Sequence, residues 1–132
     1  MLGIPVRRDA ATAAFLDGTA RDQFLLVRDT QTGTLLAPQF DTTIDPDRYE
    51  HVPAAGTGTV VSWSVVHRRQ ADGTTSRHPV GIVELDEGPW WWTALDGVDP
   101  DADLLGLRVQ VAFAEAGDET IPYFTAIERT AL

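Results

Sequence analysis

The sequence predicts an all-β protein whose main part is a small closed barrel of five strands. Two observations support this prediction. On the C-terminal side, five β-rich runs separated by turn-prone links follow one another within roughly eighty residues, a spacing typical of small barrels. The fourth run alternates strictly: every second residue from Leu107 to Phe113 is a large apolar one, as expected of a strand with one buried face.

The five predicted strands are rich in β-branched and aromatic residues and are bounded by Gly, Asp or Pro. Gly56-Thr57-Gly58 is expected at the entrance to the barrel, where glycine permits sharp curvature. Residues 97–106 are expected to form a connector with room for one helical turn. The strands themselves are expected at residues 56–69, 78–88, 89–97, 107–119 and 121–130.

The N-terminal part is expected to hold a helix and a hairpin. Residues 9–17 predict a short alanine-rich helix capped by Asp9. Residues 23–29 and 33–40 predict two short strands joined by a turn. Residues 41–56 predict a loop, because Asp45-Pro46 disfavours helix there. The expected domain division is therefore residues 1–52 for the helix and hairpin and residues 53–132 for the barrel.

Composition argues against several classes of protein. The net charge is −10, and no basic stripe is visible beyond Arg68-Arg69, which argues against nucleic-acid binding. No apolar run approaches the length of a membrane span, and the first residues lack the apolar core of a signal peptide. The chain has no cysteine, so disulfides and thiolate metal sites are excluded. A cytoplasmic location is expected.

The serines and carboxylates do not form a catalytic pattern. No serine lies in a Gly-x-Ser-x-Gly context, and Ser62 and Ser64 are expected to pack as small strand residues. Glu84 and Asp86 share one strand face and could act as an acid–base pair. A solvated strand end is the favoured interpretation, because neighbouring surface acids are common. No catalytic residue is therefore expected.

Of the three histidines, only His67 is a candidate for contact with a ligand. His67 shares a strand face with Trp63, so it could contact a ligand, although a hydrogen-bonded histidine at the barrel end is favoured. His51 and His78 lie in loop or strand-start contexts and are expected to be solvated. The spacing of the histidines and carboxylates does not indicate a metal site.

Trp90, Trp91 and Trp92 stand in a row in a chain with only four tryptophans. Because side chains alternate along a strand, Trp91 points to one face and its two neighbours to the other. Two exposed indoles would form an apolar patch of the kind found at protein interfaces. The alternative is that the N-terminal helix or hairpin covers them, and the sequence leaves both open.

The order of motifs resembles a known family. Residues 56–69, 78–88 and 104–113, together with residues 12–29, are similar to OB-fold proteins associated with acyl-CoA enzymes, a family long without a known function. The resemblance implies an N-terminal helix, a rubredoxin-like zinc ribbon and an OB barrel. It also implies apolar residues at Trp91 and Leu95, which assigns Trp91 to the core.

The chain departs from that family at the ribbon. Residues 29–33 and 41–44 stand where the family carries Cys-x-x-Cys knuckles, and neither segment holds a soft ligand. A zinc-free hairpin is therefore expected; a hard cation could bind Asp or Thr there, but the spacing is not that of a calcium loop. Apolar residues available to hold the hairpin are Phe24, Leu26, Leu35, Leu36, Phe40, Tyr49 and Val52.

The resemblance implies a function in complex with another protein. It implies a non-catalytic accessory subunit of a thiolase-like acyl-CoA enzyme, such as a steroid side-chain retro-aldolase, with acyl-CoA bound in the complex and no cofactor bound by the chain alone. The alternatives are a subunit of a hotdog-fold enoyl-CoA hydratase, a single-stranded nucleic-acid-binding OB protein, and a stand-alone acyl-CoA enzyme. Candidate residues for the partner interface or the vicinity of the acyl-CoA are Trp90, Trp92, Trp63, His67 and Arg68.

Overall fold

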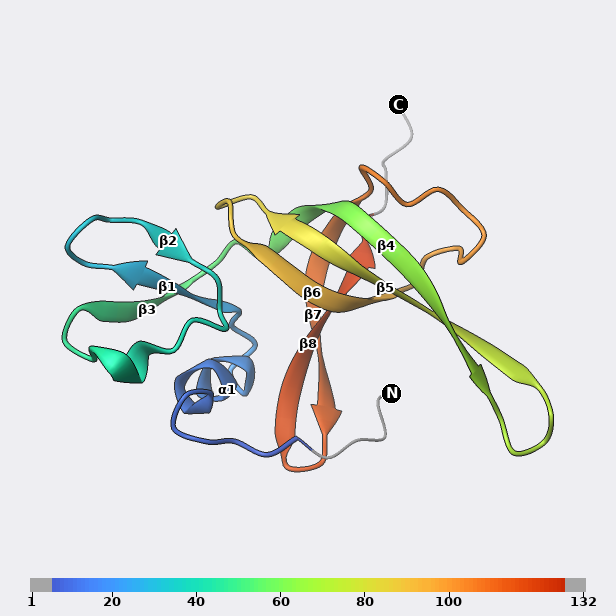
Figure 1. The fold of residues 1–132 in the computed structure, drawn as a ribbon, viewed down its shortest axis with the longest axis horizontal. Coiled ribbons are helices and arrows are strands. Elements are labelled where there is room, and N and C mark those ends of the chain that lie inside the picture. The colour runs from blue at the N-terminus through green and yellow to red at the C-terminus, as the bar shows by residue number, and fades with distance from the viewer. Residues whose placement is uncertain (1–5, 128–132) are drawn as a thin grey trace.

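Five strands close into a barrel in the computed structural model, which describes residues 6–127. The barrel order is β4-β5-β6-β8-β7, and β7 pairs back to β4. Neighbouring strands are antiparallel except for β6 and β8, which pair in parallel. The predicted five-stranded barrel is confirmed (Figure 1). The strands are β4 (Thr57–Arg69), β5 (Thr75–Leu85), β6 (Trp90–Asp96), β7 (Arg108–Ala116) and β8 (Glu119–Ala126).

The entrance to the barrel requires glycine at two positions. Gly56 has a φ of +83°, and an added Cβ would lie 2.7 Å from Val111 Cγ1. Gly58 is buried in β4, where a Cβ would lie 2.5 Å from the carbonyl oxygen of Glu84. At Gly58, backbone therefore approaches backbone so closely that a side chain would force the strands apart, and at Gly56 a side chain would combine an unfavourable φ with a clash against the Val111 side chain. The expectation for Gly56-Thr57-Gly58 is confirmed.

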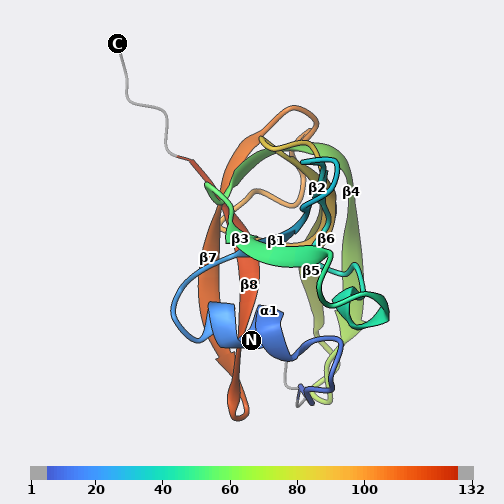
Figure 2. The same ribbon diagram turned by 90° about the vertical axis from the view of Figure 1, so that its left-hand side faces the viewer.

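A smaller sheet precedes the barrel and lies beside it (Figures 1 and 2). Its strand order is β2-β1-β3, and the short helix α1 packs against both β1 and β8. Thr19 at the end of α1 is fully buried, and its hydroxyl lies 2.5 Å from the carbonyl oxygen of Thr120 in β8. The elements are α1 (Ala13–Thr19), β1 (Leu25–Asp29), β2 (Leu35–Leu36), η1 (Thr42–Ile44) and β3 (Tyr49–Pro53).

The prediction of a loop over residues 41–56 was wrong, because β3 lies within it. β3 pairs with β1 along its whole length, from Leu25 opposite Pro53 to Asp29 opposite Tyr49. The two large apolar residues of β3, Tyr49 and Val52, are three positions apart, so no period-two pattern marks the strand. β3 is an edge strand, which is the position in a sheet where a proline is tolerated.

Other predicted boundaries shifted. The helix begins at Ala13 rather than residue 9, and Asp9 closes the preceding turn by accepting hydrogen bonds from the backbone N–H and hydroxyl of Thr12. The second strand of the hairpin, expected at residues 33–40, has only two residues, Leu35 and Leu36. Residues 97–106 form turns without a helix. The last strand ends at Ala126; residues 128–130 of its predicted span lie outside the described residues.

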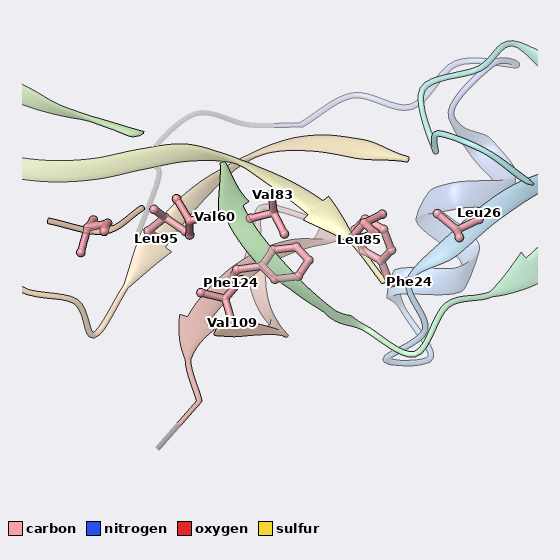
Figure 3. Close-up of a cluster of buried hydrophobic side chains, with 9 residues drawn as sticks. Phe24, Leu26, Val60, Val83, Leu85, Leu95, Val109 and Phe124 are labelled. Carbon is pink, nitrogen blue, oxygen red and sulfur yellow. The ribbon is translucent and has the colours of Figure 1, made fainter. Parts of the chain in front are cut away.

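One hydrophobic core joins the small sheet to the barrel (Figure 3). Val60, Val83 and Val109 are completely buried inside the barrel. Phe24, which precedes β1, is 2% exposed and belongs to the same cluster. The cluster of buried residues comprises Phe24, Leu26, Val60, Val83, Leu85, Leu95, Leu104, Val109 and Phe124.

An ion pair holds the small sheet where the resembling family would carry zinc. Arg48 donates from Nε and Nη2 to the carboxylate of Asp29, with the shortest contact at 2.7 Å. Asp29 also accepts a hydrogen bond from the backbone N–H of Gln31, and the N–H of Thr30 donates to the carbonyl oxygen of Arg48. These bonds link the β1–β2 turn to the segment before β3, as a metal shared by two knuckles would.

Aromatic contacts reinforce the same end of the small sheet. The rings of Phe40 and Tyr49 lie 4.8 Å apart, and the guanidinium carbon of Arg48 lies 5.5 Å from the centre of the Tyr49 ring. Stacking and cation–π contacts of this kind add to the apolar packing of a small sheet. Phe40 and Tyr49 are two of the residues expected to hold the hairpin without metal.

We expect the Asp29–Arg48 pair to make the fold acid-sensitive in a defined window. The hydrogen bond from Arg48 lowers the pKa of Asp29 from 3.8 to about 2. Because the folded-state pKa lies below the unfolded one, the pair stabilises the fold above pH 4, and this contribution is lost as the pH falls from about 4 through about 2. Urea unfolding of wild type and Asp29→Asn should therefore differ in stability at pH 7 and converge toward pH 2.

The matched control is Asp47→Asn, an exposed carboxylate on the same loop that makes no hydrogen bond with the described residues. It should track wild type at every pH. A difference between wild type and Asp29→Asn that stays constant from pH 7 to pH 2 would contradict the assignment.

Candidate functional site

The three consecutive tryptophans of β6 are divided between the two faces of the barrel wall. Trp91 is half-buried and packs against the core, and the next two residues on its face, Thr93 and Leu95, are buried. Trp90 and Trp92 lie on the outer face and are 53% and 71% exposed. Strand alternation therefore sorted the side chains as expected.

Trp91 is the tryptophan that the N-terminal segment covers. Its ring lies 5.5 Å from Phe15 of α1 and 5.3 Å from Phe24, and Phe24 in turn lies 5.8 Å from Phe124 of β8. These edge-to-face and tilted contacts close one end of the barrel. The helix and the small sheet leave Trp90 and Trp92 uncovered, so the alternative left open by the sequence does not hold.

The outer face around Trp90 and Trp92 is shaped by the register of three strands. The indole N–H of Trp90 donates to the Glu84 carboxylate at 3.0 Å, which orients the ring across β5. Trp92 stands opposite Ile82 and lines a shallow groove of about 90 Å³ that extends over Ser62 and Ser64. Both serines are exposed, so the expectation that they would pack as small strand residues was wrong.

Trp63 lines the shallow groove together with Trp92, whereas His67 and Arg68 lie farther along β4. A β-bulge between Val60 and Ser62 shifts the alternation of β4, and Trp63 packs against the barrel core opposite Gly81. His67 and Arg68 lie exposed in the part of β4 that projects beyond the barrel as a two-stranded hairpin with β5. The bulge carries no sequence signal, because the apolar run before Trp63 fits either register.

The larger surface pocket lies where this hairpin leaves the barrel. It has a volume of about 220 Å³, with Val66, Val80 and Ala94 in its wall and Arg68 and Arg77 also lining it. It is therefore apolar inside, with two cationic groups at its border. No local sequence pattern marks its aliphatic residues, because they come from three strands whose register is set only by folding.

The carboxylates that could suggest acid–base chemistry are engaged in structural bonds. Arg108 holds both carboxylate oxygens of Asp86 at 2.7 and 2.8 Å, and Thr57 donates to the same group. These bonds hold the pKa of Asp86 well below its usual range, so it stays ionised and paired. Glu84 bonds to Trp90 instead, so the two acids do not share a proton.

Ser76 and His78 form the one serine–histidine contact among residues 6–127, with Oγ and Nε2 2.8 Å apart. Ser76 Oγ also lies 3.2 Å from the carbonyl oxygen of Arg68, and it accepts a hydrogen bond from Gln70. No carboxylate orients the histidine ring, and the pair lies on an open hairpin. This arrangement lacks the orienting group of a nucleophilic site.

The ribbon-like sheet does not fit a structural zinc. Among residues 6–127, no group of three His, Asp or Glu side chains could hold a metal ion. The one carboxylate at the first knuckle position, Asp29, is bonded to Arg48, and cysteine is absent. Within the same described range, no helix has the length and apolarity needed to cross a membrane.

Comparison with known proteins agrees with this geometry. Residues 51–114 match the family described as the C-terminal OB-fold domain of ChsH2, which confirms the OB-fold expected from the sequence. Among solved structures, an Ltp2–ChsH2(DUF35) aldolase contains a chain that superposes with a TM-score of 0.71 at 27% sequence identity. The match covers 92% of this chain and 96% of that one.

A curated relative shares part of the sequence. The probable enoyl-CoA hydratase alpha subunit of Thermomonospora curvata is 38% identical over 77 residues, which is 58% of this chain. The aligned part represents 24% of the length of that relative, so the chain corresponds to about a quarter of it.

Substitution of the three tryptophans should separate their roles. Trp91→Ala should destabilise the isolated chain by about 3 kcal/mol, because it removes the ring that packs on Phe15 and Phe24. Trp90→Ala and Trp92→Ala should each change stability by no more than about 0.5 kcal/mol, as expected at exposed positions. Chemical unfolding of the three variants measures this. Equal destabilisation by all three would show that the outer indoles also belong to the packed core.

We also expect the fold to be independent of zinc, because residues other than cysteine occupy both knuckle positions. Elemental analysis of the purified protein should find no stoichiometric zinc, and a chelator should leave its melting temperature unchanged. One tightly bound zinc per chain would contradict the role given to the Asp29–Arg48 pair.

Proposed function

Because residues 51–114 match the family described as the C-terminal OB-fold domain of ChsH2, we propose that the chain is an accessory subunit of an acyl-CoA aldolase. Its partner is a thiolase-like catalytic subunit, comparable to the Ltp2 component named in the solved aldolase. The chain stabilises that subunit and helps to shape its acyl-CoA site. The complex is cytoplasmic, and acyl-CoA binds to the complex rather than to this chain alone.

The observation that carries this proposal is the extent of the structural match. The likeness to the ChsH2(DUF35)-containing aldolase covers 92% of this chain, so it extends beyond the barrel into the elements that precede it. A shared OB barrel alone would say little, since that fold serves many functions. A match that includes the elements before the barrel supports a shared mode of assembly.

The polar groups of the chain support a non-catalytic role. Asp86 is paired with Arg108, and Ser76 contacts a histidine that no carboxylate orients. Cleavage of a β-hydroxyacyl-CoA by retro-aldol reaction breaks the Cα–Cβ bond, converts the β-hydroxyl into a carbonyl and protonates Cα. It therefore needs a base for the hydroxyl proton and an acid for the α-carbon. We assign both groups to the partner.

A second candidate function follows from the hydratase relative. The 77-residue alignment with the probable enoyl-CoA hydratase alpha subunit favours a role beside a hydratase of the hotdog fold. The two candidates share an acyl-CoA substrate and a protein partner, and they differ in the reaction that the complex performs.

The test compares the chain alone with the chain co-expressed with the Ltp2-like subunit of the same organism. A β-hydroxyacyl-CoA with a steroid side chain is the first substrate, with the corresponding enoyl-CoA as the second. We expect no turnover by the chain alone and retro-aldol cleavage by the co-purified pair. Robust turnover by the isolated chain, or failure of the two proteins to co-purify, would overturn the proposal.

A further inference from the structure

The outer face of β4, β5 and β6 carries an aliphatic and aromatic strip. Ile82 stands between Ser62 and Trp92 in the sheet, and Val80 stands between Ser64 and Ala94. Val66 extends the same face beyond them and is 42% exposed. We name this surface the outer strip; it comprises Val66, Val80, Ile82, Trp92 and Ala94.

The outer strip is unusual for the solvated side of a small barrel. The outward-facing positions of antiparallel strands are normally polar, and here the β5 and β6 positions of two adjacent rows are apolar, beside a serine of β4 in each row. Trp92 at one end is 71% exposed and contributes the largest side chain of the strip. Contiguous apolar surface of this kind marks sites of contact with another molecule.

A basic hairpin continues the strip at its other end. Residues 67–78 form the part of the β4–β5 hairpin that projects from the barrel, seen at the lower right of Figure 1. They hold three arginines and two histidines but only one carboxylate, whereas the whole chain has a net charge of −10. Arg77 is paired with Asp101, 2.6 Å away, and Arg68 and Arg69 have no such ion pair with the described residues. We name this segment the basic arm. Arg68 and Arg77 line the same pocket as Val66, Val80 and Ala94, so the arm and the strip are continuous.

We propose that the outer strip and the basic arm form one docking surface for a protein subunit that presents an apolar patch bordered by carboxylates. The proposal rests on the proposed function, in which this partner is the Ltp2-like catalytic subunit. It specifies which face of the barrel meets that subunit and which side chains set the strength and the rate of association.

Charge favours a protein partner of this kind over the other occupants. Arginines within an acidic chain attract carboxylates on a partner, and opposite charges at the border of an interface steer association. A nucleic acid needs cations along its whole path, but the cations of this surface are confined to the basic arm, and Glu84 lies beside Trp90 next to the other end of the strip. A second copy of the chain would meet it with the same net charge of −10, which opposes association.

The two parts of the surface should affect binding differently. A large, exposed aromatic residue that becomes buried at an interface slows dissociation, because its apolar contact must be broken. Exposed arginines at a border raise the association rate through long-range attraction, and this effect falls with salt. Trp92 should therefore control the dissociation rate, and Arg68 with Arg69 should control the association rate.

The experiment measures association and dissociation rates of the chain with the Ltp2-like subunit of the same organism, at low and high salt. Trp92→Ala should weaken binding by about 30-fold or more, mainly through faster dissociation and at either salt concentration. The double variant Arg68→Gln, Arg69→Gln should lower the association rate about 10-fold at low salt and flatten its salt dependence. Val66→Ser offers a second test of the strip, should Trp92→Ala fold poorly.

Matched controls lie elsewhere on the surface. Ile44 is 70% exposed and lies in η1 of the small sheet, so Ile44→Ser removes an exposed apolar residue away from the strip. Arg21→Gln removes an exposed arginine outside the basic arm. Both controls should bind as wild type does.

The outcomes separate this proposal from the proposed function. Wild-type binding that neither the strip nor the arm variants change would overturn the docking surface and leave the accessory role intact. Failure of wild type to bind the Ltp2-like subunit would overturn both. A homodimer lost in Trp92→Ala, or salt-sensitive binding of a single-stranded oligonucleotide lost in both sets of variants, would assign the surface to another occupant and overturn the proposal.

Discussion

The aromatic contact between Phe24 and Trp91 is the interaction on which the rest of the structure depends. A five-stranded barrel of this size has an open end, and here Phe24 fills it with its ring against Trp91 and Phe124. Phe24 precedes β1, and its carbonyl oxygen accepts a hydrogen bond from Ala54 at the exit of β3. The small sheet is thereby fixed to the barrel core, and α1 is held on top through Phe15.

The small sheet shows how a ribbon can persist without metal. A zinc ion joins two loops by ligand bonds of fixed geometry, and cysteine is needed for that chemistry. In this chain, a two-pronged contact between Arg48 and Asp29, together with the tilted Phe40–Tyr49 ring contact, joins the β1–β2 turn and the segment after β2 to the start of β3. An ion pair of this kind depends on pH rather than on metal supply, since protonation of the carboxylate removes it.

The division of the β6 side chains between the inner and the outer face of the barrel has a functional consequence. The N-terminal segment packs against Trp91 on the inner face of β6. Trp92 points to the outer face of the same strand and is therefore exposed, on the surface that also carries the basic arm. The outer face of the barrel carries an apolar strip beside exposed arginines, a composition typical of surfaces that bind another protein. Two adjacent residues of β6 thus have different roles: Trp91 points inward and stabilises the fold, and Trp92 points outward toward the proposed partner.

The sequence by itself determined the five barrel strands, the glycines at the barrel entrance and the alternation that places Trp91 on the opposite face from Trp90 and Trp92, because these follow from local periodicity and steric limits. Only the tertiary structure decided that Tyr49–Pro53 is a strand, that Trp63 turns inward and that Val80 and Ile82 meet Trp92 on one outer face. Each of these depends on pairing register or on a bulge, which are set by contacts between distant segments rather than by neighbouring residues.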